Sequence, residues 1–126
     1  MEYETVNEKR ENTCNEVDIA KDEVNYKKLQ LKENLENINK ILHGIKKRRK
    51  IISSLIYLKS NWTNSINYEE QLKMARRSLE GYLTCYKTLI LERKLLKNKF
   101  KQAQRKLSKK KKRLGEFYNK YFPEEY

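Results

Sequence analysis

Apolar residues recur at intervals of seven along the first half of the chain. The series is unbroken and consists of Val17, Val24, Leu31, Ile38, Ile45 and Ile52. Residues three or four positions further on are often apolar as well: Ala20, Leu35, Ile41, Leu42, Leu55 and Ile56. A period of seven places such side chains in one stripe of an α-helix, which a second helix must cover. We therefore predict that residues 1–14 are a polar lead-in and that residues 15–59 form a coiled-coil helix. Its stripe is imperfect at Lys27 or Lys28 and at Asn34.

A second repeat of seven extends over residues 68–121. It comprises fifteen positions, and all but Arg93 and Lys110 are apolar or aromatic. One series is Leu72, Leu79, Tyr86, Arg93, Phe100, Leu107, Leu114 and Tyr121, and the other, three residues on, is Ala75, Tyr82, Leu89, Leu96, Ala103, Lys110 and Phe117. Ile52 and Leu72 are twenty residues apart rather than twenty-one, so the two repeats are out of phase.

The segment between the repeats, residues 60–67, is rich in residues that cap helices and form turns. Ser65 or Asn67 is expected to cap the second helix, with Glu69 and Glu70 in its first turn near the positive end of the helix dipole. The predicted fold is all-α, with two long helices at about residues 15–59 and 67–120 and a tail at 122–126. The helices form either a coiled-coil hairpin or a broken rod that packs with partner helices.

Charge is distributed unevenly along the chain. Residues 1–44 carry seven Lys/Arg and ten Asp/Glu, whereas the whole chain has a net charge of +13. In a hairpin, the acidic residues 2–23 would lie near the basic residues 105–113. This match favours the hairpin, although an acidic partner helix would satisfy the same cations.

The sequence offers no arrangement of residues typical of an enzyme. His43 is the sole histidine, and Cys14 and Cys85 lie far apart without ligand spacing, so no catalytic, metal or cofactor site is predicted. Two cysteines without a framework suit a reducing compartment. The longest apolar run is far shorter than a membrane span, so no membrane partner is expected.

Around residues 82–96 the apolar stripe is wider than one partner helix covers, because Leu83, Ile90, Leu91 and Leu95 lie beside the repeat. A wide stripe packs against two neighbours. We therefore expect a bundle with other helical subunits, as a hetero-oligomer or a homodimer. The predicted interface residues are Leu72, Leu79, Tyr82, Leu83, Tyr86, Leu89, Ile90, Leu96, Phe100, Phe117, Tyr121 and Phe122.

Two runs of five cations are the strongest local signals. They are Lys46, Lys47, Arg48, Arg49 and Lys50, and Lys109, Lys110, Lys111, Lys112 and Arg113. Three interpretations remain open: a solvated helix face, a nuclear import signal, or contact with the phosphate backbone of DNA, RNA or chromatin. Lysine predominates, which suits sequence-independent contact. Five consecutive helical residues point in all directions, so any such binding is expected to have low specificity.

The last stretch of the second repeat ends in four aromatic residues among six, from Phe117 to Phe122. Gly115 is expected to loosen the helix and Pro123 to end it. The aromatic residues are predicted to form a docking plug, either for the chain's own hairpin or for a partner.

Residues 114–123 resemble the Leu-Gly-x-Phe-Leu-x-x-His-Phe-Pro stretch that follows the coiled coil in the centromere protein K family. The matching residues are Leu114, Gly115, Phe117, Phe122 and Pro123, whereas Tyr118 and Tyr121 stand where the pattern has Leu and His. The resemblance implies an inner-kinetochore subunit that coils with centromere protein H and associates with centromere proteins I and M near the centromeric nucleosome.

The favoured hypothesis is therefore a non-enzymatic scaffold subunit of a multiprotein complex, at the kinetochore in its most specific form. It would be nuclear in that case and cytoplasmic otherwise. The alternative is a helical protein that binds nucleic acid without sequence preference through its basic clusters.

Overall fold

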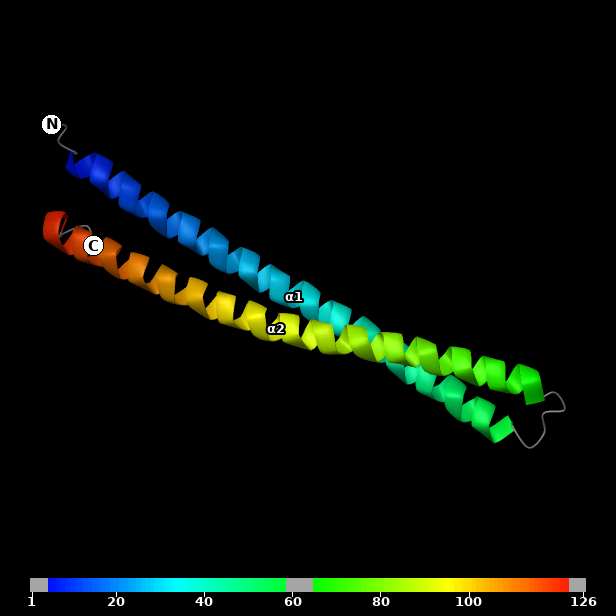
Figure 1. The fold of residues 1–126 in the computed structure, drawn as a ribbon. Helices are drawn as coiled ribbons and strands as arrows, with labels where there is room; N and C mark the ends of the chain where they lie inside the picture. Colours follow the sequence, from blue (N-terminus) through cyan, green and yellow to red (C-terminus); the bar gives the residue numbers. More distant parts are fainter. Residues whose placement is uncertain (1–4, 59–64, 123–126) are drawn as a thin grey trace. The chain divides into compact units, whose positions relative to one another are not determined.

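The computed structural model describes residues 5–58 and 65–122, and nearly all of them are helical. Helix α1 spans Val6–Leu58 and helix α2 spans Ser65–Tyr121 (Figure 1). Strands are absent from these two described stretches. The prediction of an all-α protein with two long helices is confirmed.

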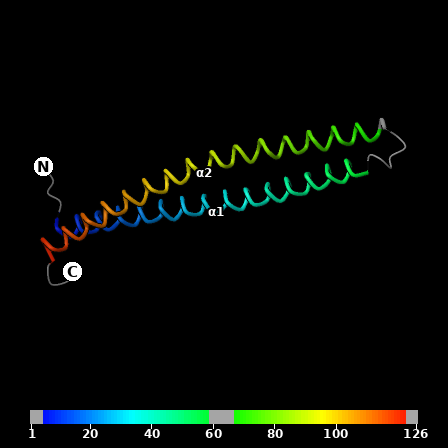
Figure 2. Tube along the Cα trace, turned by 90° about the horizontal axis from the view of Figure 1, so that it is seen from below, coloured from blue at the N-terminus to red at the C-terminus, as the bar shows by residue number. Residues whose placement is uncertain are grey.

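The chain divides into two compact units. The terminal unit combines the residues up to Lys32 with those from Leu95 onwards, and the central unit is Glu33–Lys94. Within each unit, a segment of α1 lies beside a segment of α2 that runs in the opposite direction (Figures 1 and 2). The two helices therefore form a hairpin, which excludes the broken rod.

Contacts within the terminal unit show the antiparallel order directly. In the terminal unit, the Glu16 carboxylate lies 3.2 Å from the Lys110 ammonium, and that of Glu23 lies 3.9 Å from that of Lys106. The position along α2 therefore falls as the position along α1 rises. These pairs also confirm that the hairpin brings acidic and basic residues of the two helices together.

Helix α1 begins nine residues before the predicted start at residue 15, so residues 6–14 are not a lead-in. The cause is a reciprocal cap at Thr5 and Glu8. The Thr5 hydroxyl oxygen accepts a hydrogen bond from the Glu8 backbone N–H at 3.1 Å, and the Glu8 carboxylate accepts one from the Thr5 N–H at 3.1 Å. Threonine followed three residues later by glutamate is the sequence signal that the prediction passed over.

Helix α2 begins at Ser65, so Asn67 lies inside its first turn and is not the cap. The predicted break at residues 60–67 begins two residues after the end of α1 at Leu58 and overlaps the first three residues of α2. Residues 59–64 lie outside the described part. At the other end, α2 runs through the buried Gly115 to Tyr121 without loosening there. Pro123, the expected terminator, is also outside the described residues.

The seven-residue repeats form the seam between the helices. Among its best-covered apolar residues are Val17 (4% exposed) and Ile45 (5%) in α1, and Leu96 (8%) and Ala103 (3%) in α2. In α1 the second row of the seam lies three residues after the first, at positions such as Ala20 and not four residues after it. The apolar residues four positions on are exposed: Leu35, Leu42 and Ile56.

Two of the polar residues that interrupt the stripes, Asn34 and Arg93, meet across the seam. Asn34, only 3% exposed, donates a hydrogen bond from its side-chain amide to the Leu89 carbonyl at 3.1 Å, and its oxygen accepts one from the Arg93 guanidinium at 3.4 Å. Lys110, the other interruption of the α2 stripe, is half-buried and pairs with the exposed Glu16. A buried polar group tolerates few other alignments, so the contacts of Asn34 favour one register of the hairpin.

The helices approach closely where Gly44 of α1 faces Tyr82 of α2. A Cβ atom on Gly44 would lie 2.8 Å from Cδ1 and 2.9 Å from Cζ of the ring, and nearer still to Cε1. The Arg48 guanidinium stacks 5.4 Å from the centroid of the same ring, and its Nε donates to the Ser78 hydroxyl at 2.8 Å. The absent side chain at Gly44 therefore makes room for the tyrosine.

Candidate partner-helix interface

The residues predicted to meet a partner helix mostly pack within the chain's own hairpin. Eleven of the twelve are buried or half-buried, and Tyr121 is the exception at 37% exposed. Tyr82, for example, is covered by Gly44 and Arg48 of α1. Whether any of these residues also contacts another protein stays a prediction.

The four C-terminal aromatic residues form a cluster against the start of α1. The centroid of the buried Phe117 ring lies 4.9 Å from that of Tyr121 and 6.1 Å from those of Tyr118 and Phe122. The Arg10 guanidinium lies 5.1 Å from the Phe122 ring centroid, and the Cys14 sulfur 3.8 Å from the Tyr118 hydroxyl oxygen. The plug therefore docks on the chain's own hairpin, which was one of the two predicted alternatives.

One flank of the central unit leaves apolar side chains uncovered. Leu35, Leu42 and Ile56 of α1 are 44%, 43% and 51% exposed. On α2, Leu83 and Ile90 are half-buried beside the seam. We call this flank the Leu42 face, and define it by the seven-spaced residues Leu35, Leu42, Arg49 and Ile56 of α1 and Glu69, Arg76, Leu83 and Ile90 of α2.

Contacts on the other flank establish that these two series share a side of the hairpin. Two series of α2 flank the seam, one on each side. Ser78 and Cys85 belong to one of them, and Arg76 and Leu83 belong to the other. Ser78 bonds Arg48, and Cys85 lines a hollow with Asn37 and Ile41 of α1. The series containing Arg76 and Leu83 must therefore border the seam on the remaining side, with Leu42.

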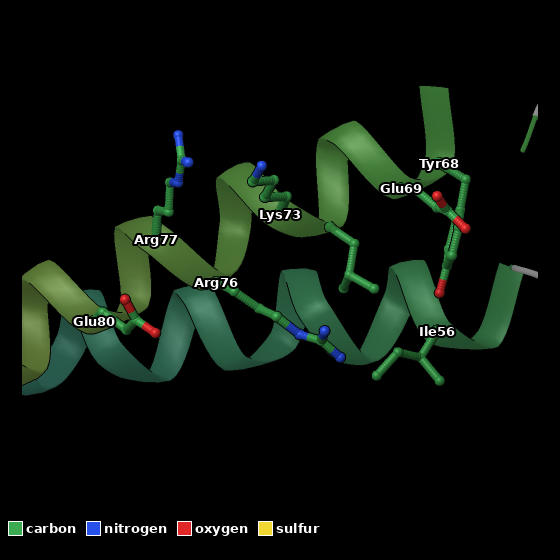
Figure 3. Close-up of a pocket in the computed structure, with 8 residues that line it drawn as sticks. Ile56, Tyr68, Glu69, Lys73, Arg76, Arg77 and Glu80 are labelled. Atoms are coloured by element: carbon green, nitrogen blue, oxygen red, sulfur yellow. The ribbon is translucent and has the colours of Figure 1, made fainter. Parts of the chain in front are cut away.

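Two open grooves are hollowed into the Leu42 face. The first has a volume of about 780 Å³ and lies between the helices, with Ile56 of α1 on one wall and Tyr68 and Leu72 of α2 on the other. In Figure 3 Arg76 extends from α2 across towards α1, while Lys73 and Arg77 point away from α1. The second groove, of about 640 Å³, runs along α1 beside Leu42 and Ile45.

Cations outnumber carboxylates around both grooves. The basic lining residues are Lys46, Arg49, Lys50, Lys73, Arg76 and Arg77, and the acidic ones are Glu69 and Glu80. Within the described part of the central unit, none of these cations lies within ion-pair distance of a carboxylate. The Leu42 face thus combines an apolar floor with an unneutralised basic border.

The first basic cluster does not form one surface. Arg48 turns into the seam, where it contacts Ser78 and Tyr82, while Lys46, Lys47, Arg49 and Lys50 remain exposed around α1. This agrees with the expectation that consecutive cations of a helix point in different directions.

The second basic cluster lies in the terminal unit. Lys110 is half-buried and paired with Glu16, and Lys109, Lys111, Lys112 and Arg113 are exposed. A shallow groove of about 520 Å³ nearby is lined by Lys27, Lys99, Gln102, Ala103, Arg105, Lys106 and Lys109, with Glu23 its single acid.

The residues considered for catalysis are distributed over both units. Exposed His43 and Cys85 lie in the central unit, and half-buried Cys14 lies in the terminal unit. Over residues 5–58 and 65–122, no three His, Cys, Asp or Glu side chains come together as metal ligands. Neither α1 nor α2, over the same residues, contains a stretch long and apolar enough to cross a membrane.

Leu35, Leu42, Ile56 and Arg76 of the Leu42 face are not among the interface residues predicted from the sequence, whereas Leu83 and Ile90 are. A signal was present for the three apolar residues, since each stands four positions after a seam residue. No signal in the sequence placed Arg76 beside them, because that depends on how α2 packs against α1.

Comparison with protein-family models, with curated proteins and with solved structures finds no match for this chain.

Proposed function

We propose that this protein is a non-enzymatic assembly subunit that docks a helix of another protein against its own two-helix hairpin. The Leu42 face carries the proposal. Its leucines and isoleucines border a completed seam, and they are too regularly spaced for scattered surface residues. Contiguous exposed apolar side chains rimmed by polar ones are typical of protein-interaction sites.

The geometry suits a third helix. A groove between two antiparallel helices accepts the apolar side of another helix, as in three- and four-helix bundles. The floor of such a groove is present here in Leu42, Ile45, Ile56 and Leu72. The added helix would cover side chains that are already about half buried in the hairpin. Each leucine or isoleucine would therefore contribute roughly half of the 1.5–3 kcal/mol typical of complete burial, before the costs of association.

The test is to isolate the tagged chain from cells that express its own gene and to size what co-purifies. We expect a second protein in stoichiometric amount. The variant Leu35→Gln/Leu42→Gln should release it, and the control Met74→Gln/Leu91→Gln should retain it. The control residues are more exposed, at 70% and 65%, but lie off the Leu42 face. A chain that is monomeric throughout contradicts the proposal.

In its most specific form, this role would be that of an inner-kinetochore subunit of the centromere protein K type. The resemblance of residues 114–123 supports that form, and centromere protein H would then be the expected helical partner. Imaging of the tagged chain in dividing cells tests it. Accumulation at centromeres is expected, whereas a uniform distribution would remove the kinetochore assignment and leave the general scaffold role standing.

A second candidate function is contact with nucleic-acid backbones. It is favoured by the groove lined by Lys99, Arg105, Lys106 and Lys109, where a single carboxylate opposes the cations. Binding to duplex DNA or RNA should then weaken steeply with salt, with a log–log slope that becomes about one smaller when Arg105 is replaced by Gln. Absence of binding at about 50 mM salt would remove this candidate.

A further inference from the structure

We infer that the helix received by the Leu42 face is acidic and amphipathic: its apolar side covers Leu35, Leu42 and Ile56, and its carboxylates lie against the cations that border the two grooves. The inference rests on the proposed docking function and specifies the chemistry of the partner.

Charge is the first argument. Arg49 and Arg76 belong to the face itself, and Lys46, Lys50, Lys73 and Arg77 border it. The carboxylates of Glu69 and Glu80 are outnumbered, and no ion pair among the described residues neutralises these six cations. Lysine at the flanking positions of a docked helix would be repelled by these cations. Glutamate at the same flanking positions could pair with them on both α1 and α2.

Position is the second argument. Arg76 extends from α2 towards α1 across the first groove (Figure 3), so its guanidinium lies where the edge of a docked helix would pass. Arg49 stands one seven-residue repeat beyond Leu42 and lines the second groove with it. Each of the two series that define the face thus carries one arginine beside its apolar residues, and charges that flank apolar residues in this way help to select the partner in helical interfaces.

A second copy of this chain fits the face poorly. The central unit carries thirteen Lys/Arg against six Asp/Glu over residues 33–94. Two copies that joined by their Leu42 faces would place the same six bordering cations opposite one another. The like charges oppose a homodimer through this surface and favour a different, acidic chain.

The experiment is a selection from a displayed library of helical peptides of about four heptads, with the full-length chain as bait. Residues 33–58 of α1 extend over about 39 Å at 1.5 Å per residue, which four heptads match. Every peptide has leucine at its core positions, and glutamate or lysine in equal proportion at its flanking positions. We expect retained peptides to be enriched at least about tenfold in glutamate-flanked members, and to bind more weakly as salt increases.

Matched variants of the bait locate the binding. Arg49→Glu/Arg76→Glu should weaken the retained peptides by about tenfold or more, whereas Lys40→Glu/Lys47→Glu, which changes the net charge equally but lies off the face, should have less than about a twofold effect. Leu35→Gln/Leu42→Gln should abolish binding, and Met74→Gln/Leu91→Gln should preserve it. Circular dichroism of each variant establishes that it is folded.

The outcomes separate this inference from the function on which it rests. Retained peptides with equal numbers of glutamate and lysine, lost in Leu35→Gln/Leu42→Gln, would overturn the acidic partner and leave docking intact. Acidic peptides that bind equally to all variants would overturn the site. Failure to retain any peptide would overturn the docking function itself, and concentration-dependent dimers of the chain alone, abolished by Leu35→Gln/Leu42→Gln, would overturn the argument against a second copy.

Discussion

Replacement of Gly44 and Gly81 by alanine tests the packing of the central unit most directly, because the two glycines differ in one respect. Both lie inside long helices, where glycine is less favourable than alanine by about 1 kcal/mol. A Cβ on Gly81 would meet no atom within 4 Å, whereas a Cβ on Gly44 would overlap the Tyr82 ring. Gly81→Ala is therefore expected to raise the free energy of unfolding by up to about 1 kcal/mol.

At Gly44 the same gain is offset by the overlap. The Tyr82 ring lies between the helices, and the stacked Arg48 guanidinium limits its movement. Overpacking of this kind typically costs about 1–3 kcal/mol. We thus expect the free energy of unfolding of the Gly44→Ala variant to be about 1–3 kcal/mol lower than that of the Gly81→Ala variant. At the upper end of this range, Gly44→Ala would be less stable than the unsubstituted protein.

Urea unfolding followed by far-ultraviolet circular dichroism measures both free energies. Tyr82→Leu is then introduced into each variant. Because the leucine side chain is smaller than the tyrosine ring, Gly44→Ala should now stabilise the protein, whereas the effect of Gly81→Ala on the free energy of unfolding should be unchanged. If the two alanine variants are equally stabilising, the ring does not pack on Gly44, and the close approach of the helices there is refuted.

Three further changes test other parts of the fold. Thr5→Ala removes the cap of α1 and should cost its first turn about 1 kcal/mol, seen as faster amide exchange at residues 6–9; unchanged exchange would contradict the cap. Asn34→Leu/Arg93→Leu should raise the unfolding midpoint but broaden the distances between spin labels on the two helices, because the polar pair restricts the register. A single narrow distance would show that apolar packing alone sets it. Phe117→Ala should lower the free energy of unfolding by about 3 kcal/mol or more, and the terminal unit should unfold before the central unit, as hydrogen exchange would show. An equal loss of exchange protection in both units would refute the idea that Phe117 stabilises the terminal unit alone.

The candidate site was only partly accessible from the sequence. The apolar character of Leu35 and Leu42 and the density of cations at residues 46–50 are visible in the amino-acid order. Their combination into one face is not, because residues of α2 supply half of it. Of the interface residues predicted on α2, Tyr82 and Leu96 are covered within the hairpin, whereas Leu83 and Ile90 belong to the Leu42 face.

The sequence by itself determined the helical class, the two long helices and the rows of α2 that enter the seam. These follow from the seven-residue period of apolar residues, which can be identified in each helix separately, whatever its partner. It also held the cap that starts α1, in the spacing of Thr5 and Glu8.

Only the tertiary structure decided which neighbours of the α1 row are covered. A helix has 3.6 residues per turn, so positions three and four residues on flank the same stripe, and both Ile41 and Leu42 are apolar. In the hairpin, α2 packs on the side of Ile41 and leaves Leu42 exposed. The same packing joined Asn34 to Arg93 and brought Tyr82 onto Gly44. These residues are too far apart in the chain for a local sequence pattern to predict that they are in contact.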